Sequence, residues 1–164
     1  MRVLIACEFS GVVRDAFRER GHDAWSCDLL PTEREGPHIQ GNVLPVAANT
    51  WDLLIAHPPC TFLCNSGVRW LIGNKGRWKA MNSAAAFFNA LLIGPVPRIA
   101  VENPIQHGYA RDILPLYQQL IQPWQFGHGE TKATCLWLKN LPPLMPTEIV
   151  RGRRATVHRM PPSP

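Results

Sequence analysis

Short apolar runs alternate along the chain with stretches in which apolar residues recur at helical spacing. Apolar runs rich in β-branched residues predict buried strands at residues 2–6, 23–26, 51–56, 98–101, 124–126 and 134–138, with a weaker strand around 38–43. Helical spacing predicts helices at residues 12–20, 78–93 and 110–121, the last with Pro115 inside it. Residues 30–36 are polar and contain Pro and Gly, which indicates a loop.

Strands that alternate with helices predict an α/β domain with a doubly wound, mostly parallel, Rossmann-like sheet of six or seven strands. Ligands of such sheets bind beyond the carboxyl ends of the strands. Polar or reactive side chains follow three of the predicted strands, at residues 7–11, 57–60 and 102–104. Because parallel strands end at the same edge of a sheet, we expect these three segments to converge on one site.

Length and cysteine usage point to one intracellular domain. The 164 residues suit a single core, and the five cysteines have no disulfide-framework spacing, so we predict free thiols in a reducing cytoplasm. The apolar start reaches Glu8 too soon for a signal peptide, and we predict no membrane association. The net charge of +5 favours a polyanionic partner only weakly.

The last part of the chain differs from the rest in composition. From Lys139 onward it is rich in Pro and Arg and has no hydrophobic periodicity. We therefore divide the chain into a catalytic domain at residues 1–138 and an irregular C-terminal arm at residues 139–164.

The second and third of the three segments carry a thiol and a carboxyl group. Pro58 and Pro59 each fix their own φ, so Cys60 follows a buried strand on a stiff backbone. Glu102 leaves the next strong strand in the same manner, followed by Asn103 and Pro104. The alternative is an inert buried Cys and a solvated or helix-capping Glu.

These motifs resemble those of a known family. Pro59-Cys60 and Glu102-Asn103-Pro104, in this order, resemble the Pro-Cys and Glu-Asn motifs of cytosine-C5 DNA methyltransferases. Residues 7–11 resemble that family's Asp-Leu-Phe-Ala-Gly loop for S-adenosylmethionine, and residues 41–43 resemble a Gly-Asp-Ile segment that contacts adenine. The resemblance covers residues 2–137 and suggests a short, minimal or truncated member.

The resemblance implies methyl transfer from S-adenosylmethionine to C5 of a flipped-out cytosine in DNA. It implies that Cys60 is the nucleophile, that Glu102 is the acid at ring N3, and that Lys132 is a catalytic cation. We expect Arg69 or Lys132 to lower the pKa of the Cys60 thiol. The cofactor-binding residues it implies are Phe9, Ser10, Gly11, Asp28, Asn42 and Pro58; the substrate-binding residues are Pro59, Arg69, Asn103 and Pro104. No metal is expected.

The sequence also departs from the family pattern. Cys7 replaces the first Asp of the cofactor loop, Val12-Val13 replace a glycine pair, Asn42 replaces an Asp, and His57 replaces a Gly-like residue. The family's Gln-x-Arg-x-Arg segment has no clean match; residues 131–134 lie at about that place. The large target-recognition region and the final segment of the cofactor pocket have no counterpart.

Several alternatives stay open at this point. His57, Cys60, Cys64 and Cys135 are candidate metal ligands. An amino-methyltransferase is another alternative, but its Asp/Asn-Pro-Pro-aromatic motif does not match His57-Pro58-Pro59-Cys60. Two further alternatives are a non-catalytic relative that binds DNA or a partner, and an enzyme that methylates free cytosine nucleotides. The basic, Trp-containing residues 66–79 either contact phosphates or form a solvated loop.

Overall fold

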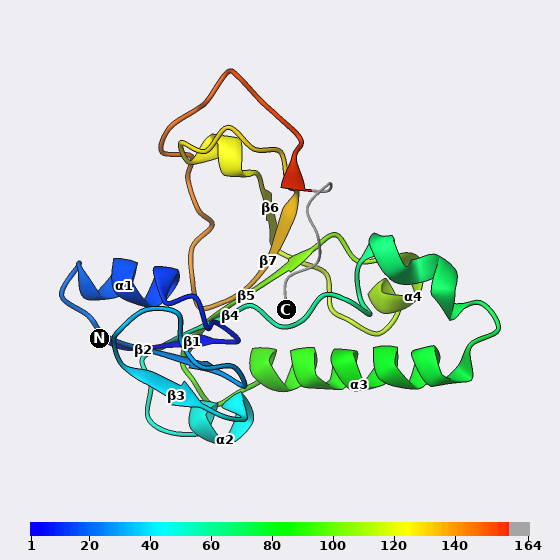
Figure 1. The fold of residues 1–164 in the computed structure, drawn as a ribbon, viewed down its shortest axis with the longest axis horizontal. Coiled ribbons are helices and arrows are strands. Elements are labelled where there is room, and N and C mark those ends of the chain that lie inside the picture. The colour runs from blue at the N-terminus through cyan, green and yellow to red at the C-terminus, as the bar shows by residue number, and fades with distance from the viewer. Residues whose placement is uncertain (158–164) are drawn as a thin grey trace.

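The computed structural model describes residues 1–157, which form a seven-stranded sheet with the order β3-β2-β1-β4-β5-β7-β6 (Figure 1). Strands β3, β2, β1, β4 and β5 are parallel, and β7 is antiparallel to both of its neighbours. The predicted mostly parallel α/β fold is therefore confirmed. The strands are β1 (Arg2–Ala6), β2 (Asp23–Asp28), β3 (His38–Gln40), β4 (Leu53–Ala56), β5 (Arg98–Pro104), β6 (Gln119–Ile121) and β7 (Thr134–Lys139).

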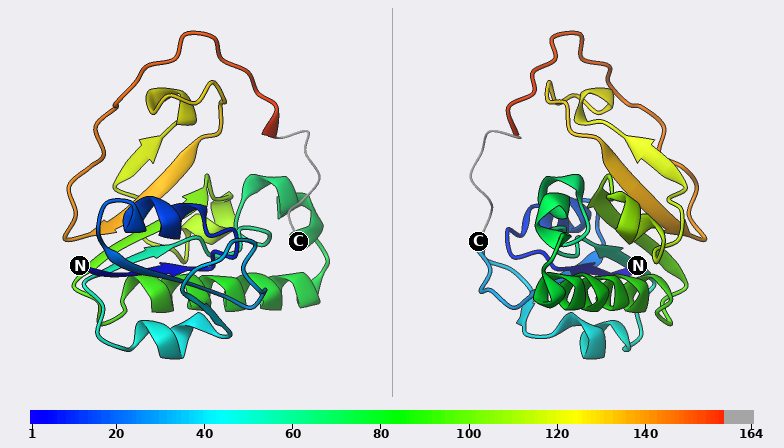
Figure 2. Two further views of the ribbon diagram at one scale, coloured as in Figure 1. Left: turned by 60° about the vertical axis from the view of Figure 1, so that its left-hand side comes forward. Right: turned by 90° about the vertical axis from the view of Figure 1, so that its right-hand side faces the viewer.

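Helices cover both faces of the sheet (Figure 2). They are α1 (Val12–Arg18), α2 (Val43–Ala47), α3 (Lys75–Leu92) and α4 (Gly108–Arg111), with 3-10 turns η1 (Asn65–Leu71) and η2 (Pro123–Gln125). Side chains of a strand alternate between faces. Leu4 and Ala6 therefore join the core beneath α2 and α3, whereas Val3 and Ile5 pack with Phe17 of α1. Within residues 1–157 no helix is both long and apolar enough to span a bilayer.

Two predicted elements are wrong. The helix expected at 110–121 ends at Arg111, because Pro115 lacks the N–H that would continue it, and residues 119–121 join the sheet as β6. The strand expected at 124–126 is instead largely the 3-10 turn η2, which starts at Pro123. Helix α2 was not expected; the side chain of Asn42 caps it by accepting a hydrogen bond from the Leu44 amide.

The described part of the C-terminal arm folds back on the connection between β6 and β7. Bridges join Phe126 to Glu148 and Glu130 to Arg154, and the guanidinium of Arg153 lies 3.7 Å from the Trp124 ring centroid. We call residues 122–131 and 147–157 the β6–β7 lobe; it projects beyond the sheet in Figure 1. The rest of the predicted arm, residues 158–164, lies outside the described residues, and the domain division at 138 stays a prediction.

Arg14 of α1 anchors the loop that follows β2. Its side chain is fully buried and forms an ion pair with Asp15 at 2.8 Å. It also donates to the carbonyls of Arg34 and Glu35, and to two hydroxyls. This one guanidinium therefore fixes the loop at residues 30–36 beside the end of β2.

We expect Arg14→Met to lower the free energy of unfolding by about 3 kcal/mol, since it leaves buried acceptors without a donor. Urea unfolding monitored by circular dichroism measures the change. The control is Arg20→Met, because the exposed side chain of Arg20 donates a single hydrogen bond within residues 1–157, to the Ala16 carbonyl. Equal unfolding midpoints for the two variants would contradict the assigned role of Arg14.

Candidate functional site

The exits of β1, β4 and β5 meet at one cavity of about 460 Å³, as the sequence predicted. The three strands pair in register, with Ala6 opposite Ala56 and Ala56 opposite Val101, so their carboxyl ends lie side by side. We call this space the strand-exit cavity. Its lining includes these predicted site residues: Phe9, Asp28, Pro58, Pro59, Cys60, Glu102, Asn103, Pro104 and Lys132.

A buried hydrogen bond fastens the β4 exit to the β5 exit. The side-chain amide of Asn103, which is only 1% exposed, donates to the carbonyl of Pro58 at 2.8 Å. This bond holds the backbone of the double proline against β5. The bond therefore fixes the backbones that carry Cys60 and Glu102 relative to each other, because each residue lies within two positions of Pro58 or Asn103.

Two buried polar residues that sequence reasoning missed support the turn after Cys60. The backbone amide of His107 donates to the Leu63 carbonyl at 3.1 Å, and its Nε2 lies 3.0 Å from the Phe62 carbonyl. Gln106 forms a bridge with Cys64. The available signal was the pair Gln106-His107 directly after a strand exit, since polar residues in that place serve as local anchors.

The Cys60 thiol interacts with a second thiol, that of Cys64. Cys60 opens a helical turn in which its carbonyl accepts from the amides of Leu63 and Cys64, and the Ser66 hydroxyl lies 3.0 Å from Cys64 Sγ. Hydrogen bonds from the Cys60 thiol and Ser66 lower the pKa of Cys64 to about 5, against the opposing effect of burial. The first thiolate of the pair therefore forms on Cys64.

The expected activation of Cys60 by a cation is wrong. Its pKa is raised, first because its thiol is hydrogen-bonded to Cys64, then by burial and by the charge of Glu102. Neither Arg69 nor Lys132 is among the main causes of that shift. Arg69 is exposed, with its guanidinium 4.6 Å from the Trp70 ring centroid, and it does not line the strand-exit cavity.

Glu102 has His57 as its neighbour across the cavity. His57 Nδ1 lies 3.4 Å from Glu102 Oε2, and both side chains are partly buried. Within residues 1–157, no group of three or more His, Cys, Asp or Glu side chains is arranged to hold a metal ion. His57, Cys60, Cys64 and Cys135, the candidate metal ligands, therefore form no such group among these residues.

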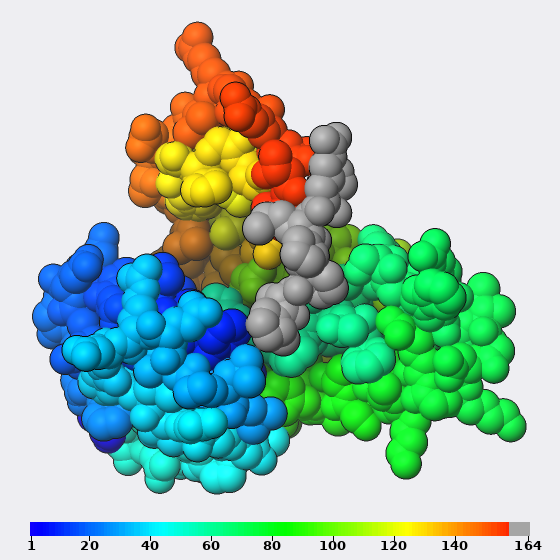
Figure 3. Space-filling view, in the orientation of Figure 1, coloured from blue at the N-terminus to red at the C-terminus, as the bar shows by residue number. Residues whose placement is uncertain are grey.

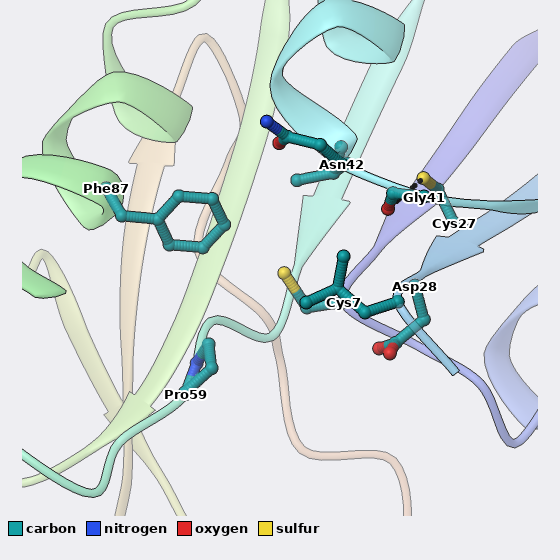
Figure 4. A pocket seen from close by; sticks show the side chains of 9 residues that line it. Cys7, Cys27, Asp28, Gly41, Asn42, Pro59 and Phe87 are labelled. Atoms are coloured by element: carbon teal, nitrogen blue, oxygen red, sulfur yellow. Dashed lines mark hydrogen bonds between the residues drawn. The ribbon is translucent and has the colours of Figure 1, made fainter.

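A second cavity, of about 380 Å³, adjoins the first at the end of β2, and we call it the β2 cavity. Figure 4 shows Cys7 between Phe87 of α3 on one side and Asp28 of β2 on the other. Burial and the charge of Asp28 raise the pKa of Cys7 to about 12, so this wall is a neutral thiol. The cavity is lined by Cys7, Cys27, Asp28, Leu29, Gly41, Asn42, Val43, Pro59 and Phe87. It shares Cys7, Asp28, Leu29 and Pro59 with the strand-exit cavity.

The loop between β1 and α1 is tightly folded. Gly11 has φ 73°, and a Cβ at this position would lie 2.6 Å from the Arg14 guanidinium, so a side chain is excluded by strain and by space. The Ser10 hydroxyl donates to Glu8 Oε1 at 2.8 Å. Neither Gly11 nor Ser10 lines the strand-exit cavity or the β2 cavity, but Ser10 lines a smaller cavity beside this loop.

The Cys60–Cys64 pair predicts a thiolate at low pH. We expect a rise in thiolate absorbance near 240 nm centred at pH about 5, because Cys64 titrates there while burial raises the pKa of Cys7, Cys27 and Cys135. Cys64→Ala should remove this step, and Ser66→Ala should move it to higher pH.

The same lowered pKa of Cys64 links stability to pH. A thiol whose pKa is lower in the folded state stabilises the fold above its unfolded pKa, and this contribution is lost as the pH falls through about 5.

The control for the absorbance measurement is Cys135→Ala, which should leave the absorbance step unchanged. An unchanged step in Cys64→Ala would contradict the assignment.

Comparison with known proteins identifies the fold but no family. No protein-family model and no curated protein sequence matches the chain. A prophage-encoded Escherichia coli protein, named as a DNA modification methyltransferase, superposes with a TM-score of 0.51 at 14% identity, over 84% of this chain and 46% of that one.

Two further structures are similar to a smaller degree. An rRNA methylase from Escherichia coli has a TM-score of 0.46 at 20% identity, over 84% of this chain and 56% of that one. The 16S rRNA methylase RmtB has a TM-score of 0.44 at 21% identity, with coverages of 84% and 55%. The chain thus spans about half the length of these structures. Together, the sheet topology and the first similarity show that this chain has the Rossmann-like fold of S-adenosylmethionine-dependent methyltransferases.

Proposed function

We propose that the chain transfers a methyl group from S-adenosylmethionine to C5 of cytosine in DNA, through a covalent bond between Cys60 and C6 of the base. The observation that carries this proposal is the meeting of the Cys60 thiol and the Glu102 carboxyl around one cavity at the carboxyl edge of the sheet. Nucleophilic addition to a pyrimidine needs such a pair, because charge develops on ring N3 as sulfur bonds to C6.

The β2 cavity fits the cofactor. Its apolar walls, which include Val43, Pro59 and Phe87, suit an adenine ring. The Asp28 carboxylate at the end of β2 suits the ribose hydroxyls; one of its oxygens already accepts from the Leu30 amide at 3.0 Å. When bound, the cofactor supplies a methyl group on a sulfonium. Because the two cavities share Cys7, Asp28, Leu29 and Pro59, a ligand in one cavity lies next to a substrate in the other.

Each residue of the strand-exit cavity then has a definite task. The Cys60 sulfur bonds to C6 of cytosine as its S–H bond breaks and the proton passes to water. Once C5 carries the methyl group, C5 loses its proton to water and the C6–S bond breaks, which restores the ring and the thiol. Glu102 hydrogen-bonds ring N3 while the electron pair moves there. Asn103 holds the Cys60 segment through Pro58, and Pro104 ends the strand that carries Glu102.

Positive charge near the cavity supports a nucleic-acid substrate. Lys132 lines the strand-exit cavity next to the β6–β7 lobe, and Arg151, Arg153 and Arg154 are exposed on that lobe. Cations that neutralise phosphates supply most of the sequence-independent affinity for DNA. Since C5 lies inside a duplex, the cytosine reaches Cys60 only when it is flipped out.

The test of the proposal is covalent trapping. DNA of mixed sequence that contains 5-fluorocytosine is incubated with the chain and S-adenosylmethionine. Fluorine cannot leave C5 as a proton does, so we expect a stable protein–DNA adduct that survives denaturing electrophoresis. Cys60→Ala should abolish the adduct, and Cys135→Ala, which removes a buried thiol of β7, should retain it.

The outcomes separate the competing functions. A methylated product without an adduct, with the methyl on the exocyclic nitrogen, would favour an amino-methyltransferase. An adduct formed with fluorocytosine nucleotides but not with DNA would change the substrate class. DNA binding with neither adduct nor product would contradict methylation and favour a binding protein.

The acid can be tested separately. We expect Glu102→Gln to lower the initial rate of adduct formation by roughly 100-fold, because a positioned acid at N3 contributes about that factor. The measurement is single-turnover kinetics with the fluorinated DNA. Exposed Glu33→Gln removes the same charge from the loop after β2 and should retain the wild-type rate; equal rates for both variants would remove Glu102 from the mechanism.

A further inference from the structure

Two departures from the family pattern lie at one place in the fold. Glu8 stands where the family's cofactor loop has Leu, and His57 stands at a Gly-like position, so the resemblance gives a role to neither. Both residues nevertheless line a third cavity of about 250 Å³, together with Cys7, Phe9, Ser10 and Val13. We infer that Glu8 and His57 form the binding site for the α-ammonium group of the cofactor's amino-acid end, an inference that rests on the proposed function.

The Glu8 carboxyl group is buried and only half satisfied. The residue is 6% exposed, and its Oε1 accepts from the Ser10 hydroxyl at 2.8 Å and from the Val13 amide at 3.0 Å. Its Oε2 is also buried, but it has no hydrogen-bond partner among residues 1–157, and Glu8 forms no ion pair with any described cation. A buried carboxylate oxygen in this state is costly unless a cationic donor pairs with it.

His57 contributes a second free acceptor. Its Nε2 is buried and has no hydrogen-bond partner among the described residues, while Nδ1 faces Glu102 at 3.4 Å. In the neutral tautomer that donates from Nδ1 to Glu102, Nε2 is an acceptor. Two residues that line the cavity thus carry an unpartnered acceptor each, a carboxylate oxygen from the β1 exit and a ring nitrogen from the β4 exit. Two acceptors and one negative charge match a primary ammonium, which has three donors and one positive charge.

The position of the cavity selects which ammonium it receives. Cys7 lines this cavity, the β2 cavity and the strand-exit cavity, and Phe9 and His57 line both this cavity and the strand-exit cavity. A ligand whose adenine occupies the β2 cavity therefore extends past Cys7 with its amino-acid end toward Glu8. Its sulfur would then lie beside the strand-exit cavity, where the proposed reaction takes place.

Calorimetry with two nucleosides tests the inference on the 164-residue chain. S-adenosylhomocysteine carries the amino-acid end, whereas 5′-methylthioadenosine lacks it. We expect Glu8→Gln to weaken adenosylhomocysteine binding by about tenfold, the value of one charge-assisted hydrogen bond, and to change methylthioadenosine binding less than about twofold. Gln keeps Oε1 as the acceptor for Ser10 and Val13, so the loop is preserved. The matched control is Glu19→Gln, an exposed change of the same charge at the end of α1.

Each outcome decides a separate point. Selective loss for adenosylhomocysteine in Glu8→Gln, with His57→Leu giving a smaller loss in the same direction, supports the inference. Equal effects on both nucleosides, or none, overturn it while leaving the proposed function in place, because the wild-type chain still binds the cofactor product. Failure of the wild-type chain to bind either nucleoside overturns the cofactor assignment, and the inference falls with it.

Discussion

The hydrogen bond from the Asn103 side chain to the Pro58 carbonyl is the interaction on which the candidate site depends. Parallel pairing brings the ends of β4 and β5 to the same edge, but the pairing stops at Ala56 and Val101. Beyond that point the two segments are held by this buried bond, by the contact of His57 with Glu102, and by Gln106 and His107, which contact the turn after Cys60. The Cys60 thiol and the Glu102 carboxyl, 42 positions apart in sequence, are held close together because the Asn103 amide donates to the Pro58 carbonyl.

The thiol pair shows how local structure changes the chemistry of a motif. A double proline followed by Cys fixes where the sulfur lies but not its protonation. The helical turn that begins at Cys60 brings Cys64 within one turn, and Ser66 adds a second donor to the Cys64 sulfur. The negative charge of the pair therefore lies on Cys64, while Cys60 keeps its proton. Where the motif predicted a cation that lowers the pKa of Cys60, the structure has a second thiol that raises it.

The sequence predicted the sheet well because its strands are buried on both faces and read as apolar runs. It also predicted the convergence at the strand-exit cavity, since parallel strands leave little freedom in where their ends lie. Failures cluster where tertiary contacts override local pattern. Residues 110–121 have helical spacing, but Pro115 and pairing with β7 decide their structure. Gln106, His107 and the capping role of Asn42 escaped prediction because short-range polar contacts leave no periodic signal.

The reversed direction of β7 has a consequence for how the molecule divides into parts. Because β7 runs against β5, its first residue, Thr134, lies opposite Pro104 at the reactive edge, and the preceding connection hangs beyond the sheet as the β6–β7 lobe (Figure 3). The lobe adds no strand to the parallel part of the sheet, and its backbone hydrogen bonds run mainly between its own two segments. Changes of length or charge in this lobe therefore leave the pairing of the five parallel strands untouched.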